Sequence, residues 1–198
     1  MPKTILQKEE KVLRQIAKEV PLSKILTPKI KTVIKEMKAS LRSQSDGVAI
    51  AAPQIGYSLR IFVVSGKIFN ASFADVSGEG LSQDDGPRGS AGPTGTDSDR
   101  PQRASAKHKD LIFINPKISK LSRDKEWVPE GCLSVRPFYG KTYRSKKAIV
   151  TAYDENGKKF ERGGSGLLAQ IFQHETDHLN GILFIDHAKD VKAEEVAK

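Results

Sequence analysis

The chain has 198 residues, of which 37% are hydrophobic and 29% charged, and its formal net charge is +9. This length fits one domain, and no apolar run approaches the roughly 18 residues that a membrane-spanning helix requires. Residues 1–20 scatter charges among their apolar residues and so lack the continuous apolar core of a secretory signal. These features exclude a membrane protein and indicate a soluble globular one.

The single cysteine and the uneven charge indicate a cellular compartment and possible partners. Cys132 is alone, which excludes an internal disulfide and fits a reducing compartment, so we expect a cytoplasmic protein. Residues 1–65 carry twelve Lys or Arg and five Asp or Glu, a net +7. Such a basic region suits an RNA-rich neighbourhood and transient association with the ribosome, although solvated lysines on helices are the commoner explanation. No aromatic residues interleave with these lysines, and no DNA partner is expected.

The first third of the chain predicts helices. Thr27 followed by Pro28 is a good helix start, with a hydroxyl cap and then proline at the first helical position. The sequence predicts a helix over residues 28–42 and a shorter helical piece over residues 9–18. The longer helix has apolar residues at helical spacing: Ile30, Val33, Ile34, Met37 and Leu41.

The middle of the chain predicts strands. Residues 60–65 and 111–118 are rich in β-branched and aromatic residues, which favours strands. Residues 147–153 alternate toward the turn-forming run 154–157, and the pattern returns over residues 158–162. This order is typical of a β-hairpin.

A low-complexity segment interrupts the pattern. Residues 75–107 consist mainly of Gly, Ser, Asp, Pro, Thr and Arg, with almost no large apolar side chain. Such a segment cannot bury enough surface to offset its ordering entropy. We therefore expect one domain, residues 1–198, with a flexible insertion at about residues 66–109 that is a tolerated surface loop, a functional lid being the alternative.

The most informative motif is His174-Glu175-Thr176-Asp177-His178, an H-E-x-x-H sequence inside a predicted helix over residues 166–180 that Gly181 is placed to end. Histidines four residues apart lie on one helix face, so both rings can bind one metal ion while Glu175 points toward the same space. Asp177 has two interpretations: a solvent-facing charge or a residue that supports a ligand histidine from behind.

A third metal ligand is needed, and the residues leave alternatives open. Asp186 and His187 follow the helix, whereas Cys132 lies upstream in a Glu-Gly-Cys-Leu-Ser run at residues 130–134. Two imidazoles with one thiolate suit zinc or iron(II). Cys132 could instead be a small buried apolar residue, as most lone cysteines are.

A third segment, residues 46–56, follows the first predicted helix and precedes a strand. Its small residues allow the backbone to approach a ligand closely, and Gln54 offers an amide donor. By itself this segment is equally well explained as a connection between a helix and a strand.

Together the three segments resemble peptide deformylase, the polypeptide deformylase family. The family carries G-x-G-[I/L]-A-A-x-Q, E-G-C-L-S and Q-H-E-x-D-H-L-x-G in that order, which correspond here to residues 47–54, 130–134 and 173–181. The resemblance extends from about residue 10 to 187, apart from the insertion. It implies an α+β fold in which mixed β-sheet strands pack around the C-terminal motif helix.

The resemblance also implies roles for individual residues. Cys132, His174 and His178 would bind one divalent ion, natively Fe²⁺, with Zn²⁺, Ni²⁺ or Co²⁺ able to substitute. Glu175 would act as general base and then general acid. The Gln54 amide and the backbone N–H of Leu133 would stabilise the oxyanion.

The implied reaction is hydrolysis of a formyl-methionyl peptide to formate and the free methionyl peptide. Main-chain groups at Gly47, Val48 and Ala49 would pair with the substrate in an extended conformation. Val48, Ile171 and Phe172 are the candidates for an apolar pocket around the methionine side chain. Ala49 replaces a glycine of the family motif, which affects the expected rate and substrate preference rather than the metal site.

Two other functions are compatible with the residues. An H-E-x-x-H endopeptidase would take its third ligand from Asp186 or His187. A non-catalytic, metal-stabilised module would bind the ion through the same residues without turnover. Loss of the metal on mutation of Cys132 would support a deformylase over the endopeptidase. Loss of activity with the metal retained in Glu175→Gln would support an enzyme over the non-catalytic module.

Overall fold

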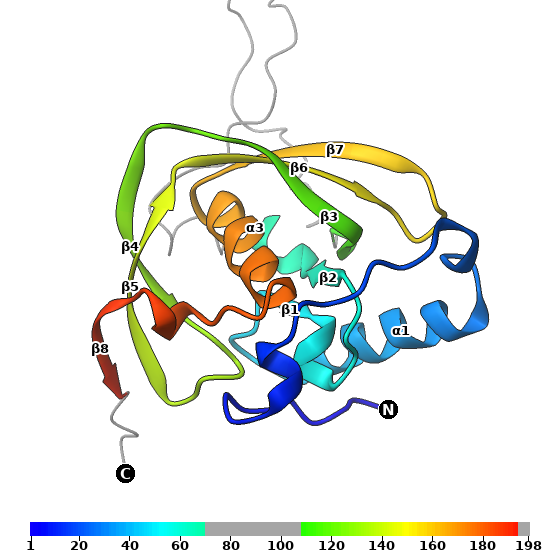
Figure 1. Cartoon of the computed structure of the whole chain (residues 1–198), viewed down its shortest axis with the longest axis horizontal. Coiled ribbons are helices and arrows are strands. Elements are labelled where there is room, and N and C mark those ends of the chain that lie inside the picture. The colour runs from blue at the N-terminus through cyan, green and yellow to red at the C-terminus, as the bar shows by residue number, and fades with distance from the viewer. Residues whose placement is uncertain (70–107, 194–198) are drawn as a thin grey trace, which may run out of the picture.

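The computed structural model describes residues 1–69 and 108–193, so most of the insertion predicted at about residues 66–109 lies outside the described residues (Figure 1). All neighbouring strands run antiparallel, in a five-stranded sheet of order β1-β2-β3-β6-β7 and a three-stranded sheet of order β4-β5-β8. The α-helices are α1 (Pro28–Arg42) and α3 (Gly166–Leu179). The strands are β1 (Ala49–Ala51), β2 (Ile61–Val64), β3 (Leu111–Leu121), β4 (Lys125–Gly131), β5 (Phe138–Ser145), β6 (Lys147–Tyr153), β7 (Lys159–Ser165) and β8 (Lys189–Ala193).

Short 3₁₀ helices connect these elements. They span Lys11–Arg14, Leu22–Lys24, Ala52–Ile55, Gly66–Phe69 and Phe184–Asp186. None of the described helices is long and apolar enough to cross a membrane.

The inner strands of the large sheet are covered on both faces. On β2, Phe62 and Val64 join the apolar cluster that includes α3, whereas Ile61 and Val63 join the cluster that includes α1. All four side chains are fully buried, which explains why this strand is apolar at every position rather than at every second one. The expected α+β fold is confirmed, with strands packed around the C-terminal helix (Figure 1).

Helix α1 has the bounds predicted from its apolar spacing. Its buried apolar residues lie on one face, which packs on β1, β2 and the Ala52–Ile55 turn. The expected hydroxyl cap is wrong in detail, because Thr27 Oγ1 donates to the Lys24 carbonyl at 2.6 Å and caps no helical N–H. The proline at the first helical position is present as predicted.

Helix α3 is held between the two sheets. Phe172 packs against Phe62 and Phe113 of the large sheet, at ring-centroid distances of 6.4 and 5.3 Å. On the other side, the Gln173 amide exchanges two hydrogen bonds with the backbone of Ser145 at the end of β5, at 3.0 and 2.9 Å. These contacts fix the rotation of the helix and therefore the direction in which its histidines point.

The end of α3 confirms the prediction for Gly181. This residue follows the helix with φ +75°, a conformation that favours glycine. A Cβ atom there would also lie 2.8 Å from the backbone of Arg14, so the position needs glycine for space as well.

Other expectations were wrong or incomplete. The helix over residues 9–18 is only the 3₁₀ turn Lys11–Arg14, because the following backbone bonds to distant segments: Ala17 N–H donates to the Leu179 carbonyl and Lys18 N–H to the Ser58 carbonyl. The predicted strands at residues 60–65 and 111–118 and the hairpin are confirmed as β2, β3, β6 and β7. No strand was predicted where β4, β5 and β8 lie.

Candidate active site

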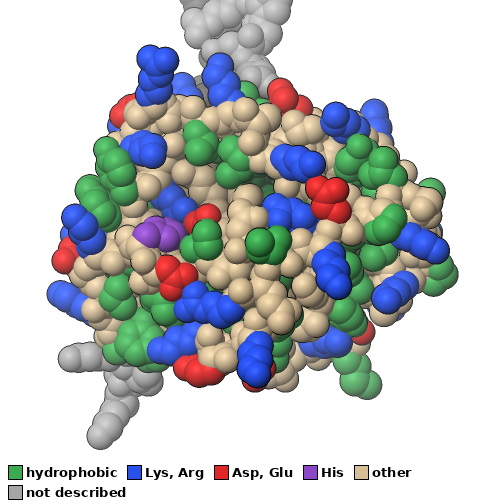
Figure 2. Space-filling view, in the orientation of Figure 1, with side chains coloured by type: hydrophobic (Ala, Val, Ile, Leu, Met, Phe, Trp, Pro, Cys, Tyr) green, Lys and Arg blue, Asp and Glu red, His purple; other side chains and the backbone are tan. Residues whose placement is uncertain are grey.

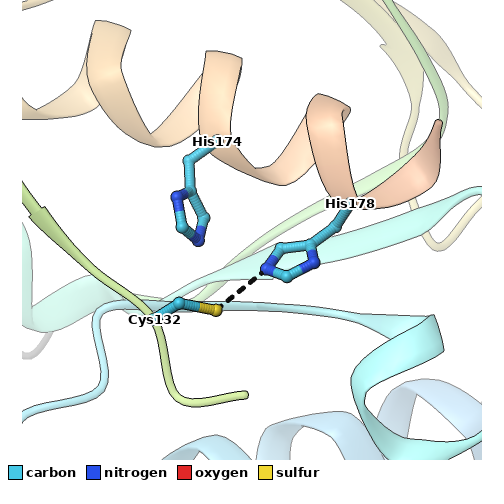
Figure 3. Close-up of side chains that lie close together, drawn as sticks. All are labelled: Cys132, His174 and His178. Atoms are coloured by element: carbon cyan, nitrogen blue, oxygen red, sulfur yellow. Dashed lines mark hydrogen bonds between the residues drawn. The ribbon is translucent and has the colours of Figure 1, made fainter. Parts of the chain in front are cut away.

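Three side chains from two separate elements converge at the centre of the molecule. His174 and His178 project from successive turns of α3, and Cys132 follows the end of β4 and faces them (Figure 3). The Cys132 Sγ atom lies 3.1 Å from His178 Nε2, and the ligand atoms of the three residues all lie within 4.8 Å of one another. Among the described residues these three form the group of Cys, His or acidic side chains able to hold a metal ion.

The donor set fits a divalent transition metal. A thiolate with two imidazoles suits zinc or iron(II) and differs from the all-oxygen sets that Ca²⁺ and Mg²⁺ prefer. His174 Nδ1 is engaged with Glu130 Oε1 at 2.7 Å, which leaves Nε2 as its free donor atom. A carboxylate behind a ligand histidine in this way fixes the orientation and tautomer of the ring.

The carboxylate of Glu130 is the centre of a buried network. Besides His174, it accepts hydrogen bonds from Thr142 Oγ1 at 2.7 Å and from Arg144 Nε and Nη2 at 3.0 and 2.7 Å. Arg144 Nη1 then donates to Asp177 at 2.6 Å. Glu130 and Arg144 are 5% and 7% exposed, so two charges are buried here only because each is paired and hydrogen-bonded.

Burial and these partners act oppositely on the acidity of Glu130. Burial by itself raises the pKa of the carboxyl group, but the hydrogen bonds and charges of His174 and Arg144 outweigh it and hold the pKa well below the usual range. For Glu175, burial is the largest effect on the pKa. Its burial raises its pKa to about 7, against a smaller opposing effect of His174.

Glu175 faces an open cavity of about 790 Å³. One of its carboxylate oxygens, Oε2, is buried without a hydrogen-bond partner. A buried oxygen left in this state is unusual in a folded protein and marks a position where a polar ligand is expected. The cavity also borders β1 and β4, which are edge strands of the two sheets, so backbone groups of both strands are available to a ligand.

The other predicted site residues are distributed as follows. Gln54, Leu133, Gly47, Val48 and Ala49 all line this cavity. Gln54 is held firmly, because its Oε1 accepts from the Ala51 backbone at 2.8 Å and its Nε2 donates to Ser134 Oγ at 3.1 Å.

The space around residues 47 and 49 shows which side chains the segment 46–56 can carry there. A Cβ at Gly47 would lie 3.0 Å from Gln44 Cβ and 3.1 Å from Leu41 Cδ1, so a larger residue would have to displace these side chains. Ala49 lies in β1, and the non-glycine residues with positive φ in the described parts of the chain are Asn115 and Asp190. Ala49 therefore occupies a conformation that alanine adopts without strain.

The structure places the two other candidates for the third ligand, and Asp177, as follows. Asp186 pairs with Arg14 at 2.6 Å and accepts from the Leu183 backbone, and His187 Nε2 lies 4.0 Å from Asp177; neither belongs to the group around Cys132. Asp177 is a supporting residue through Arg144 rather than a solvent-facing charge.

Of the three candidates for the methionine pocket, Val48 and Ile171 line the cavity. Phe172 was wrong for that role, because it is fully buried in the core cluster. Sequence reasoning also missed Arg144 altogether, since an arginine within a charged stretch resembles a surface residue.

Comparison with known proteins gives one consistent result. The family model described as polypeptide deformylase matches residues 2–194. A peptide deformylase of Psychrobacter cryohalolentis is 33% identical over 189 residues, which cover 95% of this chain and 80% of the relative. A crystal structure of a Synechococcus elongatus peptide deformylase in complex with actinonin superposes with a TM-score of 0.69 at 30% identity, covering 96% and 80% of the two chains. A Met-Ala-Ser-bound class I type b peptide deformylase from Acinetobacter baumannii gives a TM-score of 0.70 at 26% identity, covering 94% and 99%.

Proposed function

The chain belongs to the polypeptide deformylase family of hydrolases, which remove the N-formyl group from nascent peptides, and from this premise we propose that it does so with Cys132, His174 and His178 as metal ligands and Glu175 as general base. The observation that carries the proposal is the convergence of these three ligand atoms, together with the unpartnered Oε2 atom of Glu175, which shares one cavity with Cys132 and His174. In the family the ion is most often iron(II), and the thiolate suits iron(II) or zinc.

A divalent ion held by these ligands would supply Lewis acidity and bring the pKa of water near neutrality. Glu175 accepts a proton from the attacking water as its oxygen bonds to the formyl carbon, and the raised pKa of the carboxyl suits this exchange near neutral pH. As the C–N bond breaks, Glu175 returns the proton to the leaving amine, and formate and a methionyl peptide are released.

Gln54 and Leu133 would stabilise the charge that develops on the carbonyl oxygen. The hydrogen bond from Ala51 to Gln54 Oε1 orients the amide so that its Nε2 lies near Ser134 and Cys132, and a donor held in advance needs no reorganisation during the reaction. The backbone N–H of Leu133 is proposed as the second donor.

The substrate backbone would lie between the edges of the two sheets. Gly47, Val48 and Ala49 border the cavity on the β1 side, and Gly131 borders it on the β4 side, so an extended peptide can pair with both. Val48 and Ile171 would contact the methionine side chain. The peptide Met-Ala-Ser bound to the Acinetobacter baumannii relative supports a substrate of this kind.

The test is a formate-release assay on formyl-Met-Ala-Ser with protein prepared anaerobically and analysed for metal. Wild type should release formate, and Glu175→Gln should retain the metal while its kcat falls by about 10²–10⁴-fold. Cys132→Ser should lose most of the metal. Glu161→Gln on β7 makes the same chemical change at an exposed position and should leave both properties unchanged. Full metal occupancy in wild type without formate release would overturn the proposal.

A cellular location and a partner are proposed together with the activity. The single free cysteine fits a reducing compartment, which supports a cytoplasmic location. Transient association with the ribosome stays a prediction from the charge of residues 1–65.

A further inference from the structure

The two faces of the three-stranded sheet carry different side chains. Glu130, Thr142 and Arg144 point inward to the site. Strand alternation and register put another set on the opposite side, which we name the outer face: Lys125 and Trp127 of β4, Tyr139, Lys141 and Tyr143 of β5, and Lys189 and Lys192 of β8. In Figure 1 this sheet stands at the left of α3, so the outer face turns away from the rest of the molecule.

The outer face exposes three large aromatic side chains. Trp127 is 45% exposed and Tyr143 is 52% exposed, whereas Tyr139, at 44%, also lines the active-site cavity. Trp127 and Tyr143 are direct cross-strand partners, and their ring centroids lie 5.3 Å apart. Neighbouring aromatic residues left open to solvent on one sheet face indicate a surface that binds something.

Lysines surround these rings. Lys189 Nζ lies 4.8 Å from the Trp127 ring and Lys125 Nζ lies 5.9 Å from the Tyr143 ring. Lys141 and Lys192 stand beside them in the register of β5 and β8. Asp190 opposes this charge at one point, where it pairs with Lys141 at 3.7 Å. Figure 2 shows hydrophobic and basic side chains together along this margin of the molecule.

We propose that the outer face binds single-stranded RNA, with bases stacked on Trp127 and Tyr143 and phosphates held by the lysines. An open sheet surface that combines exposed rings with positive charge provides both contacts that a single strand offers, flat bases and a phosphate backbone. A duplex keeps its bases stacked inside and could use only the lysines. An acidic peptide could pair with the lysines but has no bases to stack on the rings.

The sequence provides a direct probe, because Trp127 is the one tryptophan among the 198 residues. An unlabelled oligouridylate of about 12 nucleotides, close to known site sizes, should quench the protein's tryptophan fluorescence at low salt. The duplex of the same length should quench it much less. The full chain is used, with its metal content checked.

Variants separate stacking from charge. Tyr143→Ala should weaken binding of labelled oligouridylate, measured by fluorescence anisotropy, by about tenfold, as loss of one base–ring contact does. Lys125→Gln combined with Lys189→Gln should reduce the slope of log affinity against log salt by about 1.4, which corresponds to two phosphate contacts. The matched control is Lys31→Gln combined with Lys35→Gln on α1, which removes the same charge elsewhere and should leave the slope unchanged.

Three results would overturn the proposal: no quenching at low salt, equal affinity of Tyr143→Ala and wild type, or equal binding of the single strand and the duplex. Quenching by polyglutamate of matching charge to the same extent would also overturn it, in favour of an acidic peptide. Circular dichroism and thermal unfolding of each variant show whether a loss of binding comes from loss of the fold.

Discussion

The two faces of the β4-β5-β8 sheet carry polar and aromatic residues in an unusual arrangement. The inner face buries Glu130 and Arg144, which orient His174, whereas the outer face exposes Trp127 and Tyr143. Residues that are neighbours along one strand, such as Tyr143 and Arg144, therefore belong to different environments. The comparison indicates that in this sheet the buried charged pair, Glu130 and Arg144, contributes more to the stability of the fold than the exposed aromatic residues.

The largest effect on stability is expected from Glu130→Gln. The change removes the charge that neutralises buried Arg144, and breaking a buried pair in this way costs about 3–5 kcal/mol of unfolding free energy. His174 also loses its carboxylate partner, which should weaken metal binding by about 10–100-fold. Chemical denaturation measures the unfolding free energy, and competition with a chelator measures the metal affinity. If neither differs from wild type, the inner face of the sheet contributes no more to stability than the outer face.

Arg144→Lys should have an intermediate effect. A lysine keeps the charge, but its three N–H groups share one nitrogen, which cannot occupy the three positions from which Arg144 nitrogens donate to Glu130 and Asp177. The expected loss is about 1–3 kcal/mol, as for hydrogen bonds to charged groups. Denaturation of this variant, of Asp177→Asn and of the double variant measures how strongly the two residues are coupled; strictly additive losses would contradict a shared network.

Tyr143→Ala, one residue away, should cost much less. Its ring is half exposed and contacts mainly Trp127, and a cross-strand aromatic pair contributes about 0.2–1 kcal/mol. Thermal unfolding and formate release should both stay near the wild-type values. A loss as large as that of Arg144→Lys would show that the outer face is part of the core.

The smallest effect is expected from Glu126→Gln. Glu126 lies four residues before Glu130 on β4 and pairs with Lys146 at 3.7 Å, but the side chains are 40% and 43% exposed. Exposed pairs contribute about 0–1 kcal/mol, so the same chemical change should alter the unfolding free energy little. The ratio between the two Glu→Gln losses is the most direct measurement of what burial contributes.

The strands β4 and β5 were not predicted because polar residues face inward on them and an aromatic residue faces outward. Strand prediction relies on apolar residues facing inward at every second position, but β4 and β5 turn Glu130, Thr142 and Arg144 inward and Trp127 outward. Helix α1 and strands β2, β3, β6 and β7 were predicted because their buried positions are apolar. The helix over residues 9–18 failed because distant backbone groups take its hydrogen bonds, which no local pattern records.

The sequence by itself determined the local features of the site: two histidines one helical turn apart, a glycine to end that helix, and a Gly-Cys pair after a glutamate. These depend only on helical periodicity and residue chemistry. The residues by themselves left Asp186 and His187 open as third ligands, and the family resemblance pointed to Cys132. The tertiary structure is what brings Cys132 to the histidines and places Arg144 and Glu130 behind them. The physical reason is that such contacts depend on how β4, β5 and α3 pack, and packing joins residues that are far apart along the chain.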